Sequence, residues 1–178
     1  GMTAPAIRVA LADDQALVRA GLRALLQGQG VDVVFEADSG AALLERIVAT
    51  PVDVVLSDIR MPGLDGIEAL AALRARGDAT PVLLLTTFDD SDLLLRATDA
   101  GAQGFLRKDA APEDLREAIA RVAAGETLRQ PVSTDPGRAR YRFHDDRAPR
   151  ETFSDREGGS LGLPDGGYAN KESRRSRR

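Results

Sequence analysis

Three carboxylates follow short apolar stretches of the chain. Asp13 and Asp14 come after the stretch 7–11, and Asp58 comes after the stretch 52–56. Short, mainly apolar runs of this kind are typical of strands buried in a parallel sheet. The carboxyl ends of parallel strands meet at one edge of an open sheet, where ligands bind. If the two strands are neighbours, we expect the three carboxylates to lie close together at that edge.

Two further polar residues stand at matching points of later apolar stretches. Thr86 follows the stretch 81–85, and Lys108 follows the stretch 104–107. Both residues are therefore expected at the same edge of the sheet as the carboxylates. An ammonium group and a hydroxyl group in this position can bind phosphate oxygens.

The carboxylates predict a cation site. Carboxylates that are held together repel one another, so at least one should have a raised pKa unless a cation neutralises them. The ligands would all be oxygens, because the chain has no Cys and its only His is His144. Such a set favours a hard divalent ion, and Mg²⁺ is the cofactor we predict. With phosphate oxygens bound beside it, the predicted chemistry is in-line phosphoryl transfer to a carboxylate.

Strand and helix patterns alternate five times along the first part of the chain. The strands are expected at 7–11, 31–37, 52–56, 81–85 and 104–107. Four of the five expected helices should bury apolar faces made of Leu17, Val18, Leu22, Leu25 and Leu26; Leu43, Leu44, Ile47 and Val48; Ile67, Leu70 and Leu73; and Leu115, Ile119 and Val122. Asp38 or Ser39 should cap the second helix, and residues 89–91 should cap one further helix that ends at Gly101.

This alternation predicts an α/β fold. We expect a doubly wound, five-stranded parallel sheet with right-handed crossovers and helices on both faces. Five strand–helix units in roughly 125 residues fit the flavodoxin-like strand order 2-1-3-4-5. That order places the first strand beside the third, which would bring Asp13 and Asp14 to Asp58.

Charge and apolar content divide the chain. Residues 1–130 carry 13 Lys and Arg against 20 Asp and Glu, whereas residues 131–178 carry 11 against 8 and contain only 10 apolar residues. The first part can build a core and the second cannot. No apolar run approaches the ~18–20 residues of a membrane span, so we expect a cytoplasmic protein without a membrane partner. Residues 1–5 are expected to be the remnant of a cleaved tag and an N-terminal extension.

Four motifs occur in order, each at an expected strand end: Asp13-Asp14, Asp58-Ile59-Arg60-Met61-Pro62-Gly63, Thr86 and Lys108. With these motifs, residues 6–126 resemble the receiver domain of bacterial two-component response regulators. The resemblance implies that Asp58 is the phosphoacceptor, which takes a phosphoryl group from the phosphohistidine of a sensor histidine kinase. It also implies a switching protein, with a possible homodimer, rather than an enzyme that acts on an outside substrate.

The resemblance further implies how Mg²⁺ is held. Asp14 and Asp58 would bind the ion directly, Asp13 would bind it through a water molecule, and Arg60 would supply its backbone carbonyl. An all-oxygen ligand set of this kind is ordinary for Mg²⁺.

Three residues would respond to phosphorylation, again by resemblance. Lys108 would pair with the phosphoryl group, and Thr86 would move to hydrogen-bond it. The ring of Phe105 would turn inward behind Thr86. The new charge would thereby shift the receiver between two conformations.

The C-terminal part resembles a damaged DNA-binding region. The receiver is similar to those of the LuxR-type (NarL-like) subfamily, whose members carry a C-terminal helix-turn-helix. Two islands, 152–157 and 167–172, still resemble that domain, but four glycines and a proline between them prevent the expected helix. We interpret 127–150 as a linker and 151–178 as a degenerate, largely disordered remnant. A reading frame that slips between the islands and again after the second would explain the pattern, and translating the gene in all frames tests this.

The expected function is therefore a response regulator receiver that controls a transcriptional output, with DNA as a partner only if an intact helix-turn-helix exists. The alternative is a stand-alone receiver that acts through protein contacts without DNA. A phosphatase of the haloacid-dehalogenase type would need a second Asp two residues after Asp58, where Arg60 stands. A nucleotide-binding module would need a Gly-x-Gly-x-x-Gly or Walker loop, and the sequence has neither.

Overall fold

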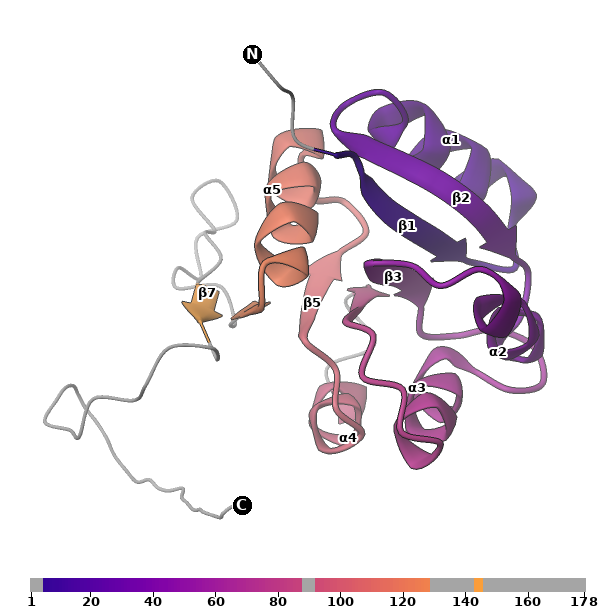
Figure 1. The fold of residues 1–178 in the computed structure, drawn as a ribbon. Coiled ribbons are helices and arrows are strands. Elements are labelled where there is room, and N and C mark those ends of the chain that lie inside the picture. The colour runs from indigo at the N-terminus through magenta and orange to yellow at the C-terminus, as the bar shows by residue number, and fades with distance from the viewer. Residues whose placement is uncertain (1–4, 88–91, 129–142, 146–178) are drawn as a thin grey trace, which may run out of the picture. The chain divides into compact units, whose positions relative to one another are not determined.

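The central feature is a five-stranded parallel sheet with the strand order β2-β1-β3-β4-β5. The structure is a computed structural model that describes residues 5–87, 92–128 and 143–145. The strands are β1 (Ile7–Ala12), β2 (Val31–Ala37), β3 (Val54–Asp58), β4 (Val82–Thr86) and β5 (Gly104–Arg107). The predicted fold class and strand order are confirmed, and β1 lies beside β3 (Figure 1).

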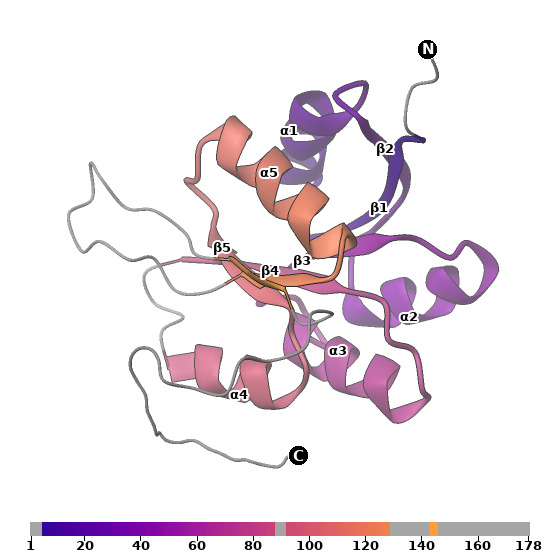
Figure 2. The ribbon, with the colours of Figure 1, turned by 60° about the vertical axis from the view of Figure 1, so that its left-hand side comes forward.

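Helices cover both faces of the sheet, as expected. They are α1 (Ala16–Leu26), α2 (Gly40–Ala49), α3 (Gly66–Ala75), α4 (Leu94–Asp99) and α5 (Pro112–Ala123). Helices α1 and α5 lie on one face, and α2, α3 and α4 lie on the other (Figure 2). No helix within the described ranges is long and apolar enough to cross a bilayer.

The core consists of two apolar layers, one on each face. Every residue of β3 and β4 is buried, because both strands lie inside the sheet and are covered twice. This explains why their sequences are almost continuously apolar. Alternate residues of the central strands therefore supply one layer under α1 and α5 and the other under α2, α3 and α4.

Local sequence signals fix the starts of two helices. The hydroxyl of Ser39 accepts a hydrogen bond from the backbone N–H of Ala42, so Ser39 rather than Asp38 caps α2. Asp65 and Glu68 form a reciprocal capping box at the start of α3. The expected cap at 89–91 lies outside the described residues.

The predicted apolar faces of α1 and α2 were too wide. Leu17 is 86% exposed and Val48 is 71% exposed, although both were expected against the sheet, and Leu25 is 40% exposed. Leu17 lies five positions from Leu22, and Val48 lies five positions from Leu43. Five positions turn a helix by roughly 140° from the buried direction, so these side chains face outward.

The core continues beyond α5 into a short strand that was not predicted. Strand β6 (Glu126–Leu128) pairs antiparallel with β7 (Phe143–Asp145). Leu128 is only 3% exposed and packs against Gly104, where a Cβ atom would come within 2.4 Å of the Leu128 Cβ. The backbone N–H of Leu128 also donates to the carbonyl of Gln103 at 2.9 Å. The expected linker 127–150 therefore begins with residues that belong to the core, while the expected remnant at 151–178 lies outside the described residues.

Leu128→Ala should destabilise the domain by about 2–4 kcal/mol, because it removes a buried side chain and leaves a cavity over Gly104. Leu17→Ala is the matched control and should change the free energy of unfolding by less than about 0.5 kcal/mol, because Leu17 is exposed. Chemical denaturation of both variants measures the difference. Equal stabilities would show that the chain after α5 does not contribute to the core.

Candidate functional site

The three predicted carboxylates meet at the carboxyl edge of the sheet. Ala12 pairs in register with Ser57, so the residues that follow them, Asp13 and Asp58, leave adjacent strands at the same level. Together with Asp14 they offer ligand oxygens that all lie within 4.8 Å of one another. The expected acidic cluster is present.

The members of this cluster lie in different surroundings. Asp13 is completely buried and Asp58 is 6% exposed, whereas Asp14 is exposed. One oxygen of Asp13, Oδ1, accepts a hydrogen bond from the backbone N–H of Gln15 at 2.8 Å. The other, Oδ2, is buried and has no hydrogen-bond partner among the described residues, although the Lys108 Nζ atom lies 3.7 Å away. A buried carboxylate oxygen without a partner is expensive unless something binds it.

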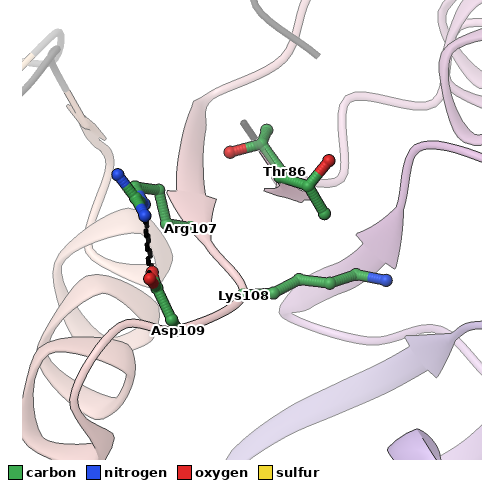
Figure 3. A pocket seen from close by; sticks show the side chains of 5 residues that line it. Thr86, Arg107, Lys108 and Asp109 are labelled. Atoms are coloured by element: carbon green, nitrogen blue, oxygen red, sulfur yellow. Dashed lines mark hydrogen bonds and ion pairs between the residues drawn. The ribbon is translucent and has the colours of Figure 1, made fainter. Parts of the chain in front are cut away.

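Lys108 places its ammonium group against the cluster. Its Nζ atom lies 3.1 Å from Oδ2 of Asp58. Its backbone N–H donates to the carbonyl of Thr86 at 2.9 Å, so the loop after β5 is tied to the end of β4. The side chain extends away from the adjacent ion pair of Arg107 and Asp109, in which the two groups bind through two bonds of 3.0 and 2.8 Å (Figure 3).

Thr86 ends β4 next to a small cavity. The cavity has a volume of about 170 Å³ and is lined by Thr86, Thr87, Arg107, Lys108 and Asp109 (Figure 3). Thr86 itself is 6% exposed. Phe105, the other residue expected to respond to phosphorylation, is partly buried against the apolar layer under α2, α3 and α4.

The positive charge of Lys108 does not fully offset the cost of burying the ionised carboxylate of Asp58. Burial raises the pKa of the Asp58 carboxyl above its ordinary value of 3.8, and the Asp13 charge raises it further. The hydrogen bond and charge of Lys108 lower this pKa, but they do not outweigh burial. Within the part of the chain that the structure describes, the Lys108 ammonium group alone therefore faces the two buried carboxylates of Asp13 and Asp58.

Arg60 belongs to the loop between β3 and α3, which borders the cluster. Arg60, Asp14 and the Met61–Gly63 segment line an open pocket of about 390 Å³ beside the acids. Asp14 is the carboxylate that lines this pocket, and the neighbouring Asp13 has a buried oxygen without a hydrogen-bond partner among the described residues. This donor set suits a hard divalent cation such as Mg²⁺, which binds carboxylates and keeps several waters.

Comparison with known proteins decides the family. The family model of the response regulator receiver domain matches residues 9–120. The chain belongs to this receiver family. The matched residues include all three carboxylates, Thr86 and Lys108.

The relatives of this receiver are NarL- and NarP-type regulators. The chain is 38% identical over 157 residues to the transcriptional regulatory protein YxjL of Bacillus subtilis, covering 85% of this chain and 72% of YxjL. It is 36% identical to the nitrate/nitrite response regulator NarP of Escherichia coli, covering 84% and 70%. Among solved structures, the receiver domain of NarL from Mycobacterium tuberculosis is 42% identical with a TM-score of 0.64, covering 68% of this chain and 99% of that domain.

Two contacts that position Asp58 were not predicted from the sequence of the receiver. The buried hydroxyl of Ser57 donates to the Asp58 carbonyl at 2.8 Å. Gly66 lies so close that a Cβ atom there would come within 2.2 Å of the same carbonyl oxygen. The absence of a side chain at Gly66 therefore lets the start of α3 pack directly against the strand end that carries Asp58.

Asp58→Asn should raise the melting temperature of the receiver at neutral pH when divalent cations are chelated. The folded state holds the Asp58 proton more tightly than the unfolded state, so ionisation of Asp58 costs stability as the pH rises through its folded pKa. The advantage of the variant should therefore shrink as the pH falls toward 3.8, the ordinary pKa. Thermal unfolding across this pH range measures the difference in melting temperature between the variant and wild type. A variant that is less stable than wild type at neutral pH would contradict the expected cost of ionising Asp58.

Proposed function

We propose that Asp58 accepts a phosphoryl group from the phosphohistidine of a sensor histidine kinase in a Mg²⁺-dependent reaction. The observation that carries the proposal is the carboxylate of Asp58 at the carboxyl edge of the sheet, 3.1 Å from Lys108 and beside Asp13 and Asp14. Asp58 is the member of the cluster that lies closest to the ammonium group of Lys108, since the corresponding distance to Asp13 is 3.7 Å. The change in the receiver then controls a transcriptional output.

The transfer needs little from the protein beyond position and charge. A carboxylate oxygen of Asp58 attacks phosphorus, a new P–O bond forms, and the P–N bond breaks with its electron pair returning to the imidazole. The residues proposed to hold Mg²⁺ are Asp14 and Asp58 directly, Asp13 through water, and Arg60 through its backbone carbonyl. The ion, when bound, supplies positive charge that offsets the phosphoryl oxygens and the repulsion among the carboxylates.

Lys108 and Thr86 are proposed to bind the phosphoryl group once it is on Asp58. Lys108 already lies against Asp58, so its ammonium group can pair with a phosphoryl oxygen after a small movement. Thr86 is tied to Lys108 through the 2.9 Å backbone bond, and the 170 Å³ cavity gives its side chain room to turn. Phe105 follows as the residue that repacks behind Thr86. These movements bias two conformations of the receiver and need no outside substrate.

Transcriptional control is proposed from the relatives, which are regulators of transcription. The nitrate/nitrite response regulator homologue of Haemophilus influenzae aligns over 167 residues, or 93% of this chain, at 34% identity. That alignment is longer than the 9–120 receiver match and so extends beyond it, which supports a shared origin for part of the chain after the receiver. We propose a cytoplasmic receiver, with a possible homodimer, that contacts DNA only where an intact helix-turn-helix accompanies it.

The wild-type chain incubated with acetyl phosphate and Mg²⁺ should gain one phosphoryl group by intact mass, and Asp58→Asn should gain none. Asp53→Asn is the matched control, because Asp53 is an exposed acid that binds the Arg8 backbone before β3 begins. It should label like wild type. Omission of Mg²⁺ should abolish labelling of the wild-type chain.

Equal labelling of wild type and Asp58→Asn would remove Asp58 from the proposed role. Repeated turnover of small phosphoesters would instead favour a phosphatase. A phosphorylated chain that binds a kinase or a second copy but no DNA would favour the stand-alone receiver over a direct transcriptional output.

A further inference from the structure

The backbone of Asp13 is held entirely from outside the acidic cluster. Its N–H donates to the carbonyl of Ala37 at 3.0 Å, and its carbonyl accepts from Nη1 of Arg19 at 2.6 Å. Its Oδ1 atom accepts from the N–H of Gln15. Among the described residues, only Oδ2 is left to face the cluster, so these three bonds determine where that oxygen points.

The Arg19 bond is itself anchored to the end of β2. Nε of Arg19 lies 3.0 Å from Oε1 of Glu36, and the two side chains are 18% and 26% exposed. Glu36 precedes Ala37, and these two residues pair in register with Leu11 and Ala12. The last two residues of β2 therefore hold Asp13 twice, directly through Ala37 and indirectly through Glu36 and Arg19.

A second arginine shares the anchor but not the contact with Asp13. Nε of Arg23 lies 2.6 Å from Oε2 of Glu36, and its side chain is 42% exposed. Hydrogen bonds from Arg23 and Arg19 hold the pKa of Glu36 below its ordinary value, although burial opposes them. Glu36 is thus a carboxylate at neutral pH and can hold both guanidinium groups.

We propose that Arg19, anchored by Glu36, is a positioning residue for the cation site: by fixing the carbonyl of Asp13 it aims Oδ2 at the cluster and strengthens divalent cation binding. This inference rests on the proposed function. Mutation of a group that orients a metal ligand commonly weakens metal affinity by about 10–100-fold. Arg19 acts through Asp13 and touches neither the cation nor the phosphoryl group.

The direction of the change in cation affinity on removal of Arg19 distinguishes a positioning role from an effect of its charge. Arg19 carries a positive charge, so if charge alone mattered, its removal would tighten cation binding. If Arg19 positions Asp13, its removal weakens binding despite the lost repulsion. Arg23→Gln removes an equal charge from the same carboxylate but leaves the Asp13 carbonyl bond in place, which makes it the matched control.

Isothermal titration with Mg²⁺ alone should show Arg19→Gln binding about tenfold more weakly than wild type, while Arg23→Gln binds as tightly as wild type or slightly more tightly. Arg19→Lys should also bind more weakly, because a single ammonium group cannot reproduce the guanidinium contacts to Glu36 and Asp13 while the charge is unchanged. Thermal unfolding of each variant under chelation confirms that the folded state is compared. If Arg19→Gln does not fold, Arg19→Lys provides the same comparison.

Equal or tighter Mg²⁺ binding by the Arg19 variants would overturn the inference. Equal weakening in Arg19→Gln and Arg23→Gln would also overturn it, because the contacts of α1 with β2 would then be the cause. In both cases the wild-type chain still binds Mg²⁺ and labels on Asp58. A wild-type chain that fails to bind Mg²⁺ or to label contradicts the proposed function itself, and this inference with it.

Discussion

Repulsion between two buried carboxylates is the constraint on which the site depends. Asp13 and Asp58 leave adjacent strands side by side, and both are almost entirely removed from water. Lys108 is the single described cation that contacts both, at 3.1 Å from Asp58 and 3.7 Å from Asp13. Charges in such surroundings interact more strongly than in water, so the folded chain carries an unfavourable term at this edge. Binding of a cation would reduce this repulsion, so the repulsion favours cation binding at this edge of the sheet.

The two apolar layers make this unfavourable term tolerable. Strands β3 and β4 are buried on both faces, and helices on each side complete the layers. Burial at this scale stabilises the fold by far more than one strained edge costs. The rigidity has a second consequence, because Ser57 and Gly66 hold the carbonyl of Asp58 in one place. The backbone of Asp58 is fixed, so the repulsion between the carboxylates is offset by protonation or by a bound cation and not by a movement of the chain.

Much of this arrangement follows from local sequence, and the exceptions have a common cause. Strand ends, and hence the position of Asp58, follow from apolar runs and the residues that interrupt them. Leu17 was misplaced because periodicity identifies an apolar face without giving its width, which depends on the shape of the sheet beneath. Leu128 was missed because its burial depends on the absence of a side chain at Gly104, which is distant in sequence. Contacts of this kind depend on the assembled fold and leave little mark on either segment alone.

Asp13 and Asp14 are adjacent and identical in the sequence but differ in burial in the structure. In the sequence they are a pair of acids that follow one strand, and nothing there distinguishes their burial. In the structure, Asp13 is buried with Oδ1 bound to Gln15, whereas the exposed Asp14 borders the open pocket beside Arg60. A carboxylate that is already committed to its own loop has one oxygen left and little freedom to move it. An exposed carboxylate can adjust both oxygens to a hydrated cation, and this difference supports the proposed direct contact of Asp14 with the cation and the proposed water-mediated contact of Asp13.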